Sequence, residues 1–314
     1  MKKNNSTEPN KRKVITTGVA VAVLLSIFGM AVSLESTAQP TDHTPGNFYA
    51  VTGKGIRDTS WVFGTYHLVK SSYLDEVPAV VRAFKQSAGV VVELVIDSTK
   101  LAAAAESGLL KGQTLTGLLD QAFTDTLEKE VQTTLGVGVA QINQLKPINV
   151  AITLSMVYIM TDKNSLLNKY SGQMIDGYFA AAGKQQGKQV TSLETLEEQM
   201  DLLFNNTTNE EQVNQLKLFL RNKEDMVRQG NELVENWFRH DLEKMYAVSL
   251  KGLDIFGGGD ELLKKRNDKW MAILPGLMEK KSQFIAVGAL HLAGPDGILQ
   301  QLQQSGYTIT PVKL

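Results

Sequence analysis

The run VVVELVI at residues 90–96 constrains the fold more than any other stretch of the chain. Continuous β-branched and aliphatic residues are typical of a strand that is buried on both faces, as in a parallel sheet covered by helices on each side. Such a strand must pair with other strands of the chain to bury its apolar faces. The run therefore predicts an α/β fold rather than a helical bundle or an open antiparallel sheet.

Strand-like segments lie near both ends of the chain. Residues 48–64 (FYAVTG and SWVFG around a turn) predict a hairpin, and further short strands are predicted at 188–194, 283–288 and 307–312. Most of the chain between about 98 and 280 has helical spacing. Because distant strands must pair, we predict an α/β fold with a mixed central sheet built from N- and C-terminal strands and a long, mostly helical insertion.

Residues 1–38 have the pattern of a targeting segment. Five lysines and arginines precede the apolar run at 14–34, and Ser36 and Ala38 stand at the −3 and −1 positions of a small-residue cleavage site before Gln39. We expect a cleaved signal peptide. One alternative is a retained membrane anchor, since about 20 apolar residues can span a bilayer, and another is a buried core helix.

Either a signal peptide or an anchor would place the rest of the chain outside the cytoplasm, in the periplasm or another extracytoplasmic space. Residues 14–34 would then be the membrane tether if they are retained, residues 39–47 a linker, and residues 48–314 a single domain. The net charge of −1 does not suggest a nucleic-acid partner, and the absence of cysteine excludes disulfides and a lipid-modified cysteine.

Two of the four histidines share one pattern, an apolar run followed by Gly-x-x-His-Leu. The first copy, WVFGTYHL, contains His67, and the second, FIAVGALHL, contains His291. Each follows a strand-like run, and ligand sites in open α/β sheets lie beyond the carboxyl ends of strands. Gly64 and Gly288 would let the chain turn sharply there. We expect the two histidines to converge on one site, and the alternative is two structural histidines bonded to loop backbone.

Glu93 interrupts the buried run, where an unpaired carboxylate would be unfavourable. With His67 and His291 it would form a two-histidine, one-carboxylate set, which suits Zn²⁺, Mn²⁺, Fe²⁺ or Co²⁺ with positions open for water. The alternative is a salt bridge from Glu93 to a core arginine such as Arg266. Glu194, at the end of its own strand, could be a further metal ligand, or it could accept a hydrogen bond from a residue that binds the metal. We favour a third role, as the cap of the next helix.

The remaining candidates have simpler interpretations. Arg266 and Asn267 lie on a highly charged helix, where a solvated face is the usual outcome, and His240 lies on an amphipathic helix and is expected to be structural. His43 falls in the polar linker and is expected to be exposed. No nucleophile elbow, phosphate loop or His-Glu-x-x-His pair occurs in the sequence, so those hydrolase and nucleotide-binding classes have no support.

Several stretches together resemble a bacterial TraB/GumN-type protein over residues 48–314. They are WVFGTYHL, VVVELVID, IDGYFAAAGKQQGKQVTSLETLEEQMDLL, KRNDKWM and FIAVGALHLAGPDGILQQLQQSGYTITPV. The family is similar to the Tiki metalloproteases and, distantly, to erythromycin esterases and ChaN haem-binding proteins. The Arg-Asn pair of the family motif would fall on Arg266 and Asn267. Tyr66 stands where many members carry an aliphatic residue, which could alter the pocket.

The resemblance implies an exported metal-dependent hydrolase that cuts peptides or proteins and uses a divalent ion such as Mn²⁺ or Co²⁺. In this interpretation His67, Glu93 and His291 bind the metal, or Glu93 is the general base, and the metal activates water. Arg266 would stabilise the developing oxyanion. The alternative is a non-catalytic haem- or peptide-binding protein that uses the same cleft.

Overall fold

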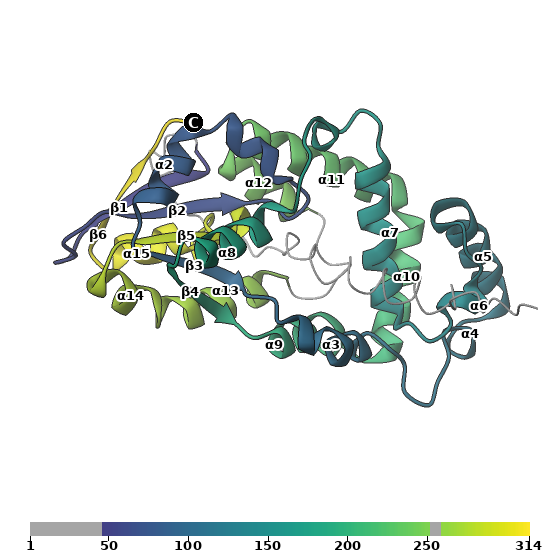
Figure 1. Ribbon diagram of the computed structural model, residues 1–314. Coiled ribbons are helices and arrows are strands. Elements are labelled where there is room, and N and C mark those ends of the chain that lie inside the picture. The colour runs from purple at the N-terminus through teal and green to yellow at the C-terminus, as the bar shows by residue number, and fades with distance from the viewer. Residues whose placement is uncertain (1–45, 252–258) are drawn as a thin grey trace, which may run out of the picture.

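The computed structural model describes residues 46–251 and 259–314 (Figure 1), with side chains of the second stretch described from residue 263 onward. The predicted targeting segment, its cleavage site and His43 therefore lie outside the described residues. Within those stretches no helix is both long and apolar enough to cross a membrane.

Six strands and a larger set of helices make up the described part of the chain. The strands are β1 (Phe48–Gly53), β2 (Ser60–Thr65), β3 (Gly89–Leu94), β4 (Gln189–Glu194), β5 (Gln283–Gly288) and β6 (Tyr307–Pro311). The α-helices are α2 (Pro78–Gln86), α3 (Leu101–Ser107), α4 (Leu115–Leu118), α5 (Gln121–Leu135), α6 (Val139–Ile142), α7 (Pro147–Thr161), α8 (Ile175–Gln185), α9 (Leu196–Phe204), α10 (Asn209–Arg221), α11 (Lys223–Phe238), α12 (Leu242–Ser249), α13 (Gly259–Met271), α14 (Leu274–Lys280) and α15 (Ile298–Gln304). Short 3-10 turns are η1 (Ser71–Asp75), η2 (Ser98–Lys100), η3 (Leu166–Lys169) and η4 (Ala289–His291).

The strands form one mixed sheet in the order β4-β3-β5-β2-β1-β6. The four strands β4, β3, β5 and β2 run parallel, whereas β1 pairs antiparallel with both β2 and β6. The predicted hairpin is β1–β2, and strands from the two ends of the chain meet where β2 pairs with β5. The predicted α/β fold, with a sheet assembled from both ends of the sequence, is confirmed.

Strand β3 has a parallel neighbour on each side, as its continuous apolar sequence predicts. Val90 and Val91 are fully buried, and α8 packs on this part of the sheet. Gly183 of α8 lies so close to the strands that a Cβ there would be 3.0 Å from Val190 and 3.1 Å from Val90. A small residue at this point lets the helix sit directly on the sheet, which fixes the position of the N-terminal turn of α8.

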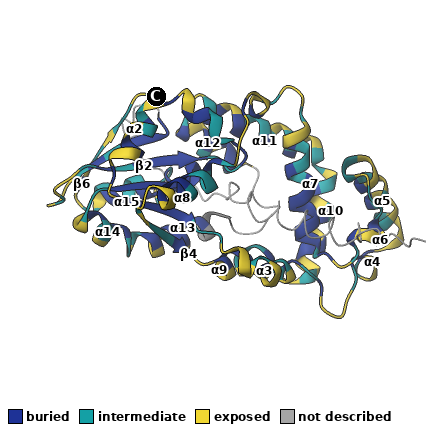
Figure 2. Cartoon of the chain, viewed as in Figure 1, coloured by how far each residue is buried: buried dark blue, intermediate teal, exposed yellow. Residues whose placement is uncertain are grey.

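The helical insertion has its own core beside the sheet. Helix α7 runs through it, as Figure 1 shows, and is buried almost all round, in agreement with its uniformly apolar sequence. The second apolar cluster consists of Leu110, Leu115, Leu119, Leu127, Val131, Val139, Ile142, Leu145, Val150, Ala151, Leu154, Val213, Leu216, Phe219 and Met226. A capping box of Thr208 and Glu211 opens α10. Figure 2 shows exposed residues on the outer faces of these helices.

Candidate functional site

The two Gly-x-x-His-Leu motifs lie side by side because β2 and β5 are neighbours. Thr65 pairs with Gly288 in the parallel register, so the residues that follow leave the sheet at the same edge. A Cβ on Gly64 would be 2.9 Å from Leu292 Cδ1 and 3.1 Å from Ala289 Cα. The first glycine is therefore needed for the close approach of the two motifs.

Neither motif glycine has a positive φ among the described residues. The turn geometry that we expected from the sequence is thus the wrong reason for glycine at these positions. Gly288 is also needed for space, because a Cβ there would be 3.0 Å from Glu93 Oε1 and 3.6 Å from both His67 Nε2 and His291 Cδ2. The side chains of His67, Glu93 and His291 are therefore brought together around Gly288.

His67 is held by a carboxylate from α8. Its Nδ1 lies 3.0 Å from Oδ2 of Asp176, which stands in the first turn of α8, and the Thr65 hydroxyl donates to the other oxygen of Asp176. The opposite ring nitrogen, Nε2, is buried and has no hydrogen-bond partner among the described residues. The ring is therefore fixed at one nitrogen and available at the other.

The charge state of His67 follows from the same contacts. Burial alone would lower its pKa, but the charge and hydrogen bond of Asp176, with a smaller effect of Glu93, raise the pKa to about 9. Conversely, burial would raise the pKa of Asp176, and the neighbouring imidazolium holds it below its ordinary value. At neutral pH, His67 is thus an imidazolium that donates from Nδ1 and presents an N–H at Nε2.

Arg266 joins Glu93 to Glu194. Its Nη2 donates to Glu93 Oε2 at 2.7 Å and to Glu194 Oε2 at 2.9 Å, and its Nε donates to Glu194 Oε1 at 2.6 Å. The other oxygen of Glu93, Oε1, accepts the backbone N–H of Gly288 at 2.5 Å. The arginine side chain is only 5% exposed, so these ion pairs are shielded from water.

His291 faces Arg266 and Asn267 of α13. Arg266 Nη1 donates to Nε2 at 2.7 Å, so the proton of the neutral ring sits on Nδ1, which donates to Asn267 Oδ1 at 2.7 Å. Burial, followed by the charges of Arg266 and His67, holds the pKa of His291 well below its ordinary value of 6.5. The expected solvated face at Arg266 and Asn267 is wrong, since both are buried against the sheet edge.

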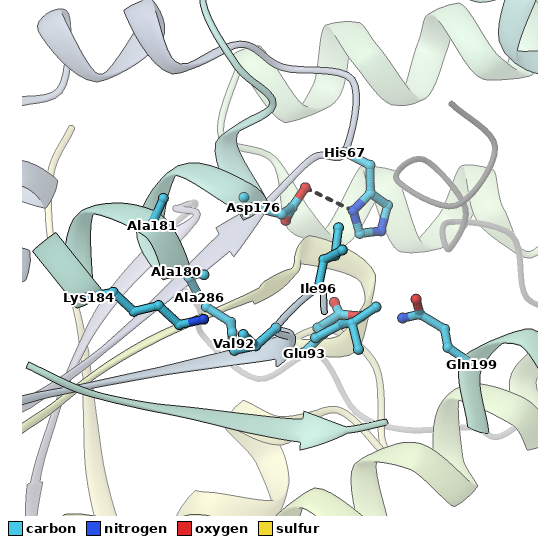
Figure 3. A pocket seen from close by; sticks show the side chains of 13 residues that line it. His67, Val92, Glu93, Ile96, Asp176, Ala180, Ala181, Lys184, Gln199 and Ala286 are labelled. Atoms are coloured by element: carbon cyan, nitrogen blue, oxygen red, sulfur yellow. Dashed lines mark hydrogen bonds and ion pairs between the residues drawn. The ribbon is translucent and has the colours of Figure 1, made fainter. Parts of the chain in front are cut away.

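A pocket of about 250 Å³ opens at this edge of the sheet (Figure 3). Its polar lining comes from His67, Glu93, Asp176, Lys184 and Gln199, and its apolar lining comes from the end of β3 and from α8. Figure 3 shows His67 with its Asp176 partner and the Gln199 amide around the space next to Glu93. His67 is therefore one of the charged groups at the wall of this pocket.

The sequence was compared with models of protein families. The model of the TraB/PrgY/gumN family matches residues 47–311. The chain belongs to the TraB/PrgY/gumN family. The resemblance predicted from the sequence is thereby confirmed at the level of the family, and no curated protein and no solved structure matches the chain.

The metal set expected for this TraB/PrgY/gumN protein does not fit the observed arrangement. Both nitrogens of His291 and both oxygens of Glu93 already take part in hydrogen bonds, and each of these groups has a bond from Arg266. Among the side chains that the structure describes, no group of three or more acidic, histidine or cysteine residues is arranged to hold a metal ion. The alternative that the sequence left open, an ion pair between Glu93 and Arg266, is present.

Two other predictions have clear outcomes. The preferred role of Glu194 as a helix cap is wrong, because Thr195 caps α9 together with Glu198, and Glu194 instead pairs with Arg266. His240 follows α11 at a positive φ of 58°, with Nδ1 3.5 Å from the Asn47 amide, in keeping with a structural role.

Sequence reasoning missed Asp176, Thr65 and Trp270. Asp176 lies 109 residues from His67, and an acidic residue in the first turn of a helix is ordinarily explained by the helix dipole. Trp270 donates its indole N–H to Glu194 Oε1 at 3.0 Å, and its ring lies 4.2 Å from the His291 ring. The sequence offers a signal for Trp270, because it stands four residues after Arg266 and three after Asn267, spacings that make side chains neighbours on a helix.

Proposed function

We propose that this TraB/PrgY/gumN-family chain is a hydrolase that acts on a carbonyl group bound in the pocket beside Gly288. The observation that carries the proposal is the state of His67, a residue of the pocket lining, whose Nδ1 is held by Asp176 while the buried Nε2 has no hydrogen-bond partner among the described residues. A histidine oriented by a carboxylate and available at its other nitrogen is the usual arrangement for proton transfer.

The protonation state of His67 makes it the proton donor of the reaction. The imidazolium Nε2–H would stabilise the developing oxyanion or protonate the leaving group. Glu93 Oε1, beside the Gly288 N–H, would accept the proton of the attacking water. Arg266 donates to Glu93, Glu194 and His291 and so keeps Glu93 in place, which makes it a positioning residue in this scheme.

We propose a peptide or protein as the substrate. The pocket is small and combines apolar side chains of β3 and α8 with five polar or charged residues, which suits one side chain or the backbone of a peptide. The metal dependence implied by the family resemblance stays a prediction, and no step of this scheme uses a metal. The non-catalytic alternative, binding of haem or a peptide in the same pocket, predicts saturable binding without turnover.

A peptide-library cleavage assay tests the hydrolase directly, with His67→Ala and, as a matched control, His240→Ala. We expect cleavage by the wild-type chain, a loss of at least about 100-fold in His67→Ala, and nearly normal activity in His240→Ala. Haem titration of the same preparations tests the alternative. Stoichiometric haem binding with no cleavage of any peptide or ester would contradict the proposal and favour the binding protein.

We also propose that the chain is exported and that residues 1–38 are removed. The support is the basic start, the apolar run at 14–34 and the small residues before Gln39. Intact-mass analysis of the protein recovered from an extracytoplasmic fraction should give a chain that begins at Gln39. A full-length, membrane-bound species would instead support the retained anchor.

A further inference from the structure

We infer that Arg266 takes the place of a metal ion among Glu93, Glu194 and His291, so that this centre is balanced by the chain's own cation and does not take up a divalent ion. The inference does not depend on hydrolysis, because it concerns what holds these three side chains together. It also differs from what the family resemblance implies, a metal bound between the two histidine motifs.

The guanidinium has the contacts that a coordinated cation would have. It donates to oxygens of two carboxylates and to the acceptor nitrogen of one imidazole, with donor–acceptor distances of 2.6 to 2.9 Å. These acceptors come from the ends of β3 and β4 and from η4 after β5. Arg266 thus joins the ends of three neighbouring strands, which is what a metal ion at the same edge of the sheet would do.

The positive charge of Arg266 already offsets the negative charge of the carboxylates in this cluster, which disfavours binding of a second cation. The guanidinium is permanently charged and already pairs with both Glu93 and Glu194. A divalent ion bound to His291 Nε2 would have to displace the arginine N–H from that nitrogen, which is the acceptor of the neutral ring. Arg266 is only 5% exposed and lies 4.8 Å from the centre of the Trp270 ring. Its displacement would break buried ion pairs, which is unfavourable.

The same contacts make Arg266 a positioning residue for the pocket. Its bond to Glu93 Oε2 leaves Oε1 turned toward the Gly288 N–H, beside the space that His67 Nε2 faces. Asn267, the next residue on α13, holds the other side of the His291 ring. Helix α13 therefore orders both the carboxylate of β3 and the second histidine motif without a metal.

Metal analysis of the purified wild-type chain is the first experiment. We expect less than about 0.1 equivalent of Mn²⁺, Co²⁺ or Zn²⁺ per chain, and a melting temperature that changes by less than about 1 °C with EDTA or with any of the three ions added. A wild-type chain that retains one equivalent of a divalent ion, or loses stability in chelator, overturns the inference.

The second experiment removes the guanidinium with Arg266→Ala. Two buried carboxylates then lack their counter-ion, so we expect the melting temperature to fall by roughly 5–15 °C. Added Co²⁺ or Mn²⁺ should recover part of that loss by entering the vacated position, with a visible Co²⁺ spectrum that the wild type lacks. The matched control is Lys264→Ala, which removes an exposed ion pair with Asp268 from the same helix and should change neither property.

Two further variants keep the outcome interpretable. The double variant Arg266→Ala with Glu194→Gln lacks one of the proposed metal ligands. Its apparent affinity for the added ion should be at least about tenfold lower than that of Arg266→Ala. If Arg266→Ala does not fold, Arg266→Lys retains a cation and should fold, less stably, without any response to metal. An Arg266→Lys chain that is stabilised by Mn²⁺ or Co²⁺ contradicts the assignment of this position to an internal cation.

Discussion

At the scale of single residues, the state of each titratable group in the site depends on one or two neighbours from distant parts of the chain. His67 is charged because Asp176 reaches it from α8, whereas burial, followed by the charge of Arg266 on α13, lowers the pKa of His291 and keeps it neutral. The two histidines share one sequence pattern but have opposite protonation states. The pattern could locate both residues, but it could not indicate their charges, which depend on partners 109 and 25 residues away.

The raised pKa of His67 predicts a dependence of stability on pH. A folded-state pKa of about 9 against the ordinary 6.5 means that the fold binds this proton more tightly than the unfolded chain. The stabilisation is therefore complete below pH 6.5 and is lost as the pH rises to about 9, with a size of up to about 3 kcal/mol.

Urea unfolding of wild type and His67→Gln from pH 6 to 9.5 measures this contribution. The difference in unfolding free energy between the two chains should shrink as the pH rises through that window. A difference that stays constant would mean that His67 is neutral in the fold. Histidine NMR spectra of the wild type should show the same titration near pH 9.

Gly288 supports a second prediction at this scale. A Cβ at Gly288 would lie 3.0 Å from Glu93 Oε1, a contact that forces the carboxylate away from the space faced by His67. We expect Gly288→Ala to lower kcat/KM at least about tenfold while lowering the unfolding free energy by only about 1–3 kcal/mol. Gly276→Ala is the control, because a Cβ at Gly276 meets nothing within 4 Å. Equal activities of the two variants would argue against a shared space at Gly288.

At the scale of elements, most strands and helices could be predicted because their apolar patterns are local. The run of β3 and the hairpin of β1 and β2 each lie within one short segment of the sequence. The placement of α13 could not be predicted in the same way. The sequence of α13 is highly charged, which predicts an exposed helix. Burial of Arg266 becomes favourable only when the fold brings Glu93 of β3 and Glu194 of β4 next to it.

The contact between the two motif turns predicts the effect of Gly64→Ala. The new Cβ would be 3.1 Å from the backbone of Ala289 and 2.9 Å from Leu292 Cδ1, so the turns after β2 and β5 would have to separate. We expect a loss of about 1–3 kcal/mol in unfolding free energy and a drop in activity, measured by urea unfolding and by the cleavage assay. A stable, fully active Gly64→Ala chain would show that the close approach of the motifs is not required.

At the scale of the whole molecule, the sheet places residues side by side that are far apart in the sequence. His67 and His291 are 224 residues apart in sequence (291 minus 67), yet they follow strands that pair residue by residue from Trp61 and Phe284 onward. The sequence was sufficient to expect this pairing because both copies of the motif follow apolar, strand-like runs. From the sequence, an ion pair between Glu93 and Arg266 was one of two alternatives. The choice between them depends on charge balance in a buried cluster, which only the complete fold determines.

The central claim is that the two motifs form one site, and a double-mutant cycle of His67 and His291 tests it most directly. His67→Ala removes the proton donor, and His291→Ala removes one of the acceptors that hold Arg266 and, through it, Glu93. Residues that act as a unit lose activity together, so kcat/KM of the double variant should be little lower than that of His67→Ala. Independent, multiplicative losses in variants whose melting temperatures show intact folding would contradict a shared site and leave both histidines with separate structural roles.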